Sequence, residues 1–147
     1  MRQWLNNDFT NEAFSFMEQT LIATMRVSAD NNPEFDTTPG NETHDEVFLL
    51  SSYEAERYFS SSSERICYPT DYAIECGATK RGINFNNGSV SCSWWLRTPG
   101  TVSWFASYVL GDGEIDNKGI STKPGDGRYV DRGSIAVRPA LWIDLDY

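Results

Sequence analysis

The sequence predicts an α+β domain in which N-terminal helices support a small antiparallel sheet with long loops. A chain of 147 residues suits one domain with a sizeable core, so the expected boundaries are 1–147. Apolar residues within 1–26 recur at steps of three and four, which is the period of an amphipathic helix. Beyond residue 77 this period is lost, and short apolar runs separated by glycine-rich turns indicate strands.

The first elements are predicted to be helical and to pack their aromatic face in the core. Residues 1–26 form two helical pieces, and Thr10 is expected to cap the second, with Glu12 in its first turn. Residues 28–46 are polar and rich in Asn, Pro and Gly, so we expect a long loop there.

A buried strand and a short helix are predicted next. The strand covers 47–50, and Ser51 or Ser52 caps a helix that runs to about residue 59. The serine run at 60–63 is predicted to be a turn.

The remaining elements are one helical turn and several strands. The helical turn opens at Pro69 and Thr70 and ends at Gly77. The segment NNGS predicts a hairpin between 83–85 and 90–92. Further strands are expected within WWL, ASYVL and AVRPALWIDL.

The charge of the chain limits its partners. A formal net charge of -9 with 12 basic residues and no basic run argues against nucleic acid, because phosphate binding needs clustered Lys and Arg. The acidity suits a solvated surface better than a basic partner or calcium, although both stay open. No apolar stretch approaches membrane-spanning length, so membrane insertion is not expected.

The start of the chain predicts no signal peptide. MRQWLNNDF has neither a basic region leading into an apolar run nor a small-residue cleavage site. Trp4 and Leu5 already have the character of buried residues, which suggests a domain cut from a longer protein. The compartment and the oligomeric state are therefore open.

Cys67, Cys76 and Cys92 are odd in number and lack CxxC spacing. This disfavours a disulfide framework and a structural zinc site. Three buried thiols in a reducing compartment are the expected state, with a single disulfide as the open alternative.

The residues that could support catalysis do not form a recognisable set. His44 is the sole histidine and lies in a polar segment with no serine or cysteine nucleophile motif beside it. No catalytic residue is predicted. Asp112, Glu114 and Asp116 alternate along an extended segment, a pattern typical of a solvated face.

The same carboxylates supply the oxygen ligands that a calcium loop needs. Gly119 comes two positions late for an EF-hand, and Lys123 stands in place of the bidentate glutamate, so that loop type is rejected. A looser calcium site stays open. No metal and no other cofactor is predicted, and the glycine pattern matches no phosphate-binding loop.

Two blocks, WWLRTPG at 94–100 and VRPALWI at 137–143, enclose a segment dense in Gly, Asp, Ser and aromatic residues. Trp94 and Trp95 are expected in the core. Arg97 and Arg138 adjoin prolines, where a guanidinium can bind backbone carbonyls and hold loops in place. This layout favours a binding module, because fixed strands would hold a loop region that carries polar and aromatic side chains.

The two blocks, together with WLNNDF and DEVFLLSSYEA, resemble an uncharacterised bacterial and phage family over almost the whole chain. The order of helices, short strands, WWLR and a late VRPAL strand is similar to the C-type lectin-like fold, as in formylglycine-generating-enzyme-type domains. The resemblance implies a variable protein of a diversity-generating retroelement, with its variable surface between Arg97 and Val137. The calcium-dependent sugar motifs of lectins are missing from the chain, and the copper-binding cysteine pair of the formylglycine-generating enzyme is unmatched.

We therefore expect a ligand-binding or adhesion module that displays this loop surface to a protein or cell-surface ligand. Val109, Gly113 and Gly119 are expected to be scaffold. The alternatives are a structural or assembly domain of a larger bacterial or phage surface protein and, third, an enzyme of the formylglycine-generating type. The predicted ligand-binding residues are Ser103, Trp104, Phe105, Tyr108, Asp112, Glu114, Asp116, Asn117, Arg128, Tyr129 and Arg132.

Overall fold

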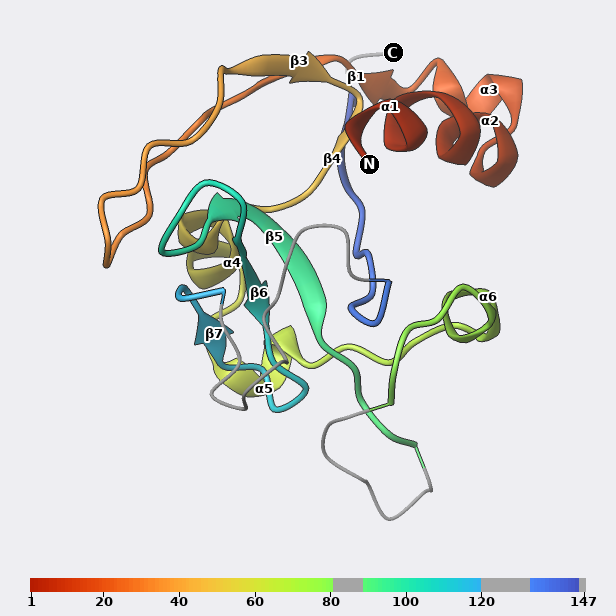
Figure 1. Cartoon of the computed structure of the whole chain (residues 1–147). Coiled ribbons are helices and arrows are strands. Elements are labelled where there is room, and N and C mark those ends of the chain that lie inside the picture. Colours follow the sequence, from red (N-terminus) through yellow and green to blue (C-terminus); the bar gives the residue numbers. More distant parts are fainter. Residues whose placement is uncertain (81–88, 120–132, 146–147) are drawn as a thin grey trace. The chain divides into compact units, whose positions relative to one another are not determined.

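The computed structural model describes residues 1–80, 89–119 and 133–145 (Figure 1). The chain is of mixed α+β class, with short helices and small antiparallel sheets. It divides into two compact units. Unit 1 comprises Met1–Ala29, Gly40–Leu49 and Pro139–Tyr147. Unit 2 comprises Asp30–Pro39 and Leu50–Arg138.

Unit 1 begins with a continuous helical run made of α1 (Arg2–Trp4), the π-helical turn η1 (Leu5–Phe9) and α2 (Thr10–Ala13). The predicted cap at Thr10 is wrong. Thr10 lies inside this run, and its buried hydroxyl donates to the Leu5 carbonyl at 2.6 Å.

The second helix, α3 (Phe16–Gln19), begins at Ser15. The Ser15 side chain accepts from the Glu18 amide, and the Glu18 carboxylate accepts from the Ser15 amide, which completes a capping box. The expected helix up to residue 26 is therefore wrong beyond Gln19, where the chain becomes extended.

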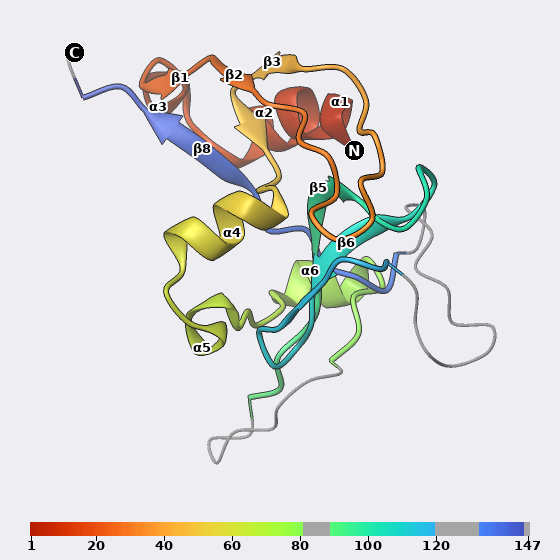
Figure 2. The same cartoon turned by 90° about the vertical axis from the view of Figure 1, so that its left-hand side faces the viewer.

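The strands of unit 1 form two small sheets. In the first, β8 (Ala140–Ile143) lies between β1 (Ile22–Ala23) and β4 (Val47–Phe48), antiparallel to both, as Figures 1 and 2 let the reader follow. In the second, β2 (Met25–Val27) pairs antiparallel with β3 (Thr43–Asp45). The predicted loop 28–46 is thus wrong at its end, where a partner strand supplies hydrogen bonds that local sequence does not reveal.

Unit 2 is built on a three-stranded antiparallel sheet in the order β5 (Trp94–Pro99), β6 (Ala106–Val109) and β7 (Ile115–Asp116). Five of the six β5 residues are buried, which explains why WWLRTP shows no alternation of apolar and polar residues. The strands predicted in WWL, ASYVL and AVRPALWIDL are confirmed.

Three short helices complete unit 2. The Ser51 cap is confirmed: α4 (Ser52–Tyr58) begins with a capping box in which Ser51 and Glu54 bind each other's backbone amides. The helix α6 (Asp71–Glu75) follows Thr70, where the helical turn was predicted to open, and the Thr70 side chain caps it. Gly77, the predicted end of this turn, has φ +104°.

The prediction of a turn at 60–63 is only partly correct. Residues of this run enter α5 (Ser62–Arg65), so the segment is helical rather than a simple turn. The helix α5 lies close to the turn between β6 and β7, which contains Gly113. The φ angle of Gly113 is +87°, and a Cβ at this residue would fall 1.8 Å from the Ser62 carbonyl oxygen. The β6–β7 turn can approach α5 only because this residue is glycine.

Two further expectations concern the hairpin at NNGS and membrane crossing. The hairpin falls on residues 81–88, outside the described residues. In the described part of the chain, no helix combines the length and apolar character needed to cross a membrane.

Candidate functional site

The structure separates the predicted ligand-binding residues by their exposure. Phe105 and Asp116 are half-buried, whereas Tyr108 and Asn117 are buried. Arg128, Tyr129 and Arg132 lie outside the described residues. The exposed members are Ser103, Trp104, Asp112 and Glu114.

Tyr108 is part of the core of unit 2. It is 2% exposed and stands opposite Trp95 in the β5–β6 pairing, with the two ring centroids 6.0 Å apart. Its hydroxyl donates to the Asp116 carboxylate at 3.0 Å. Tyr108 therefore supports the sheet and has no free face for a ligand, which corrects its place in the predicted set.

Asn117 is buried for a different reason. Its side-chain oxygen accepts from the Ser52 hydroxyl at 2.7 Å, and its amide donates to the Glu34 carboxylate at 3.1 Å. Its backbone carbonyl accepts from the Asn32 side chain at 2.7 Å. Asn117 thus joins α4, the 30–39 loop and the end of β7, and it too leaves the predicted contact set.

The loop between β5 and β6 presents Trp104, the most exposed aromatic residue among the described members of the predicted set. The Trp104 side chain is 58% exposed. Two backbone hydrogen bonds hold the loop around Trp104. The Gly100 amide donates to the Phe105 carbonyl at 2.8 Å, and the Phe105 amide donates to the Val102 carbonyl at 3.0 Å. Trp104 is therefore an exposed aromatic residue on a backbone that hydrogen bonds hold in place.

A second loop, 30–39, lies against the first. The Asn32 amide donates to the Pro99 carbonyl at 2.7 Å, and the Thr37 hydroxyl donates to the Thr101 carbonyl at 3.0 Å. The oxygen of the Asn32 side chain accepts from the amides of two residues that follow it, including Phe35 at 3.1 Å. Figures 1 and 2 both show the two loops side by side.

We call three of the exposed side chains of these two loops, Phe35, Ser103 and Trp104, the Trp104 surface. Sequence analysis missed Phe35 and its support Asn32, because both lie in a polar segment far from the two signature blocks. The dipeptide Asn32-Pro33 marks a turn, which was the available signal.

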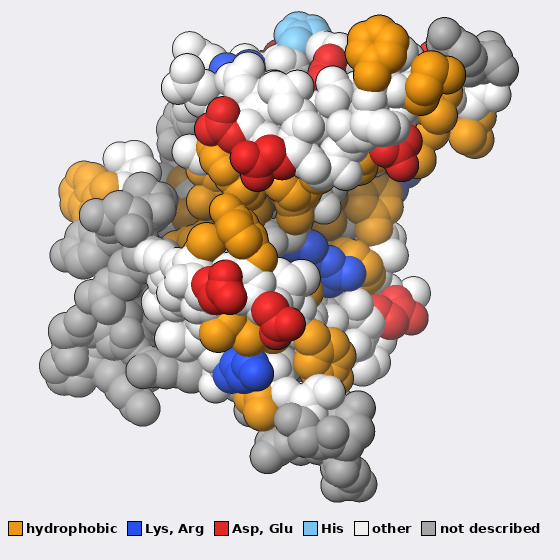
Figure 3. Space-filling view, turned by 90° about the vertical axis from the view of Figure 1, so that its right-hand side faces the viewer, with side chains coloured by type: hydrophobic (Ala, Val, Ile, Leu, Met, Phe, Trp, Pro, Cys, Tyr) orange, Lys and Arg blue, Asp and Glu red, His pale blue; other side chains and the backbone are white. Residues whose placement is uncertain are grey.

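The carboxylates of the DGEIDNKG segment stabilise turns. Asp112 accepts from the Glu114 amide at 3.1 Å, and Asp116 accepts from the Lys118 amide at 2.8 Å. Within 1–80, 89–119 and 133–145, no three His, Cys, Asp or Glu residues are grouped to hold a metal ion. On the face shown in Figure 3 the acidic side chains lie in small groups among other kinds of side chain.

The two arginines of the signature blocks stabilise unit 2 in different ways. Arg97 forms a two-pronged ion pair with Glu54, with the longer contact at 2.9 Å. Burial opposes ionisation of Glu54, but the hydrogen bonds from Arg97 and Ser51 outweigh it and lower the pKa of that carboxyl. Arg138 binds the Arg65 carbonyl at 3.4 Å, as predicted for a residue that holds backbone.

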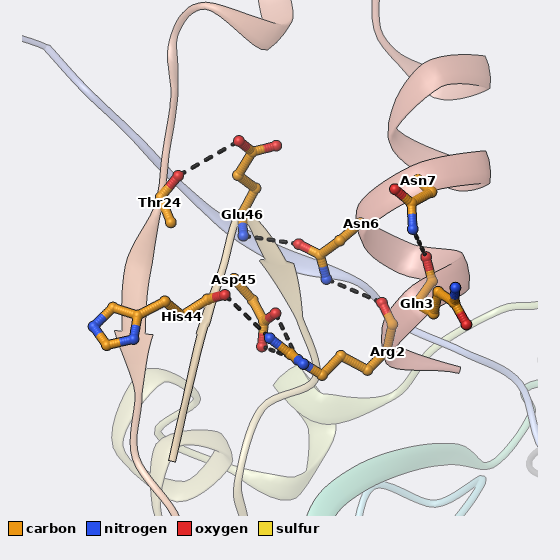
Figure 4. Close-up of a pocket in the computed structure, with 8 residues that line it drawn as sticks. All are labelled: Arg2, Gln3, Asn6, Asn7, Thr24, His44, Asp45 and Glu46. Atoms are coloured by element: carbon orange, nitrogen blue, oxygen red, sulfur yellow. Dashed lines mark hydrogen bonds and ion pairs between the residues drawn. The ribbon is translucent and has the colours of Figure 1, made fainter.

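Unit 1 contains a polar cavity of about 580 Å³, drawn in Figure 4. Arg2 donates to both oxygens of Asp45, at 2.7 and 3.0 Å, and the Asn6 side chain bonds both backbone groups of Val47. These contacts fasten the first helix to β3 and β4. The lining residues are Arg2, Gln3, Asn6, Asn7, Thr24, His44, Asp45 and Glu46.

His44 does not gain a catalytic partner in this cavity. Its side chain is exposed, and Figure 4 shows the imidazole directed away from Arg2 and Asp45. The adjacent Asp45 carboxylate is held by Arg2. The cavity therefore offers no histidine–carboxylate pair of the kind used in general base catalysis.

Comparison with known proteins identifies a family without a defined activity. A family model described as a domain of unknown function (DUF6273) matches residues 1–145. No curated protein and no solved structure matches the chain.

Proposed function

The chain belongs to the DUF6273 family of domains of unknown function, and from the geometry of its loops we propose that it is a ligand-binding module that uses the Trp104 surface. The ligand class is a protein or another cell-surface molecule. The observation that carries this proposal is an indole that is 58% exposed on a backbone held from both sides.

The energetic reason is preorganisation. Ordering a loop on binding costs free energy, and a loop already held by hydrogen bonds avoids most of that cost. Large aromatic side chains bring contact area with few rotatable bonds, which is why Trp and Tyr dominate the energetics of many interfaces. Trp104 has both properties, and Phe35 adds a second exposed ring on the adjoining loop.

The finer part of the proposal concerns the fold family and the origin of the ligand specificity. The late VRPAL strand, β8, pairs with strands from the first third of the chain, an arrangement that supports a C-type lectin-like fold. On this proposal the module belongs to a bacterial or phage surface protein, and a retroelement diversifies residues between Arg97 and Val137. Ser103 and Trp104 are then variable positions on a constant sheet.

The binding proposal is tested with two tryptophan variants of the full chain. Trp104→Ala is compared with Trp142→Ala, which removes an indole that is also exposed but belongs to unit 1. Binding of fluorescently labelled protein to intact bacterial cells is measured by flow cytometry. We expect Trp104→Ala to weaken binding at least about tenfold, with Trp142→Ala unchanged and both melting temperatures near that of the parent.

Equal binding by Trp104→Ala and the parent chain would remove the Trp104 surface from the proposal. The diversification claim is tested separately, by sequencing natural copies of the gene. Substitutions concentrated between Arg97 and Val137 at adenine-templated codons support it, and uniform variation along the chain contradicts it.

A second candidate function, an assembly domain, is favoured by a different observation. Unit 1 leaves Phe16 and Met17 of α3 exposed, together with Ile143 at the end of β8. A contiguous patch of exposed apolar side chains often marks a contact with another chain, and this candidate function requires these residues to form one. Sedimentation of the parent chain and of Phe16→Asp tests this candidate, which requires a parent oligomer that the substitution dissociates.

A further inference from the structure

Two of the three cysteines lie opposite each other in unit 2. Cys67 and Cys92 form an isolated antiparallel bridge, and the Cys92 amide donates to the Cys67 carbonyl at 2.9 Å. Directly opposite residues in such a pair have Cα atoms about 4.5–5.5 Å apart. Disulfides span Cα separations of roughly 4.4–6.8 Å, so the backbone already has the spacing that a bond between them needs.

The two thiols differ in access to solvent. Cys92 is fully buried, Cys67 is half-buried, and Cys76 is exposed at the end of α6. The expectation of three buried thiols is therefore wrong for Cys67 and Cys76. An incoming reagent can reach Cys67 and Cys76, whereas Cys92 is shielded from solvent.

The two thiols also differ in acidity. A hydrogen bond from the Cys92 thiol, helped by the positive charge of Arg138 and opposed by burial, lowers the pKa of Cys67 to about 6. The bond that it donates to Cys67, together with burial, raises the pKa of Cys92. Cys67 is therefore the more acidic of the two thiols, and Cys92 is the less acidic one.

Arg138 is held where its charge acts on Cys67. Its guanidinium lies 4.7 Å from the ring centre of Phe59 and 5.0 Å from that of Trp94. It also donates to the Arg65 carbonyl, which accepts from the Trp94 indole at 2.9 Å as well. These contacts hold the Arg138 guanidinium in place, and the Trp104 surface does not include it.

We propose that Cys67 and Cys92 are a redox-modification site, a dithiol that small-molecule disulfides oxidise reversibly to an intramolecular disulfide. The Cys67 thiolate attacks one sulfur of the reagent, forms a mixed disulfide and releases one thiolate. The Cys92 thiol then loses its proton and attacks the Cys67 sulfur, which releases the second thiolate. In total the dithiol loses two protons and two electrons, and the reagent disulfide takes up both to become two thiols.

The reaction is tested on the full chain with oxidised glutathione at pH 7.5, followed by non-reducing peptide mass mapping. We expect a Cys67–Cys92 cross-linked peptide that dithiothreitol reverses, in the parent chain and in Cys76→Ser alike. The cross-link closes a loop of about 25 residues, for which we expect a rise in melting temperature of about 5–10 °C.

Two single variants test the order of the steps. Cys92→Ser is expected to stop at a glutathione adduct on Cys67, because the resolving thiol is missing. Cys67→Ser is expected to leave Cys92 unmodified in the folded protein, because Cys92 is buried. Glutathione found on Cys76 alone in the parent chain, or a cross-link that includes Cys76, would overturn the proposal without any variant having to fold.

Discussion

Trp104 and Tyr108 are close neighbours in the sequence and have opposite roles. Trp104 is 58% exposed in the connection between β5 and β6, whereas Tyr108, on β6 itself, is 2% exposed. Both are aromatic residues in a segment rich in glycine and polar residues, and composition alone treats them alike. The difference arises because Tyr108 pairs with Trp95 and Asp116 across two neighbouring strands.

The comparison shows how a small sheet can carry an exposed loop. The side chains that hold the loops, Asn32 and Asn117, are polar but buried, and their hydrogen bonds run to backbone carbonyls and to other loops. Buried polar groups that are fully bonded specify one arrangement of the chain around them. Exposed residues on the same loops are then free to change without unfolding the sheet.

The largest expected effect is on Tyr108. Tyr108→Ala leaves a cavity between Trp95 and Asp116, so we expect the free energy of unfolding to fall by about 3–5 kcal/mol. Trp104→Ala is the matched control and should change the free energy of unfolding by less than about 0.5 kcal/mol. Urea denaturation of both variants measures the difference. Similar losses in the two variants would contradict the division between core and loop surface.

A smaller effect is expected for Asn117. Asn117→Ala leaves the Ser52 hydroxyl without its acceptor in a buried position, which should cost about 1–3 kcal/mol. Amide hydrogen exchange adds a local measure, because Thr101 N–H donates to the Lys118 carbonyl beside this site. We expect faster exchange at Thr101, with no change in the exposed control Asn41→Ala. Unchanged protection would mean that Asn117 does not hold the loops.

The smallest of the three effects concerns the Glu54–Arg97 pair. Because the folded-state pKa of Glu54 is lowered, its contribution is present above the unfolded pKa of about 4.3 and is lost as the pH falls through the folded value. Glu54→Gln should cost about 1–2 kcal/mol at pH 7 and much less at pH 3.

Urea midpoints at both pH values measure this dependence. Glu56→Gln, an exposed position on the same helix, is the control and should alter neither midpoint appreciably. An equal loss for Glu54→Gln at pH 7 and pH 3 would show that the pair acts through shape rather than through charge.

Local sequence determined several elements correctly. The Ser51 cap, the opening of a helical turn at Thr70, the strand WWL and the strand in ASYVL were all predicted, because their signals lie within a few residues of each other. The same local reasoning failed after Gln19, where the chain leaves the helix and pairs with distant strands. Intrinsic preference is weak, and tertiary pairing overrides it.

The sequence alone therefore determined the α+β class and the two signature blocks. Tertiary structure decided the rest: the burial of Tyr108, the support given by Asn32 from a distant loop and the meeting of Cys67 with Cys92. The physical reason is that burial and pairing depend on which residue stands opposite in a neighbouring strand. That register is set by contacts between segments far apart in the chain.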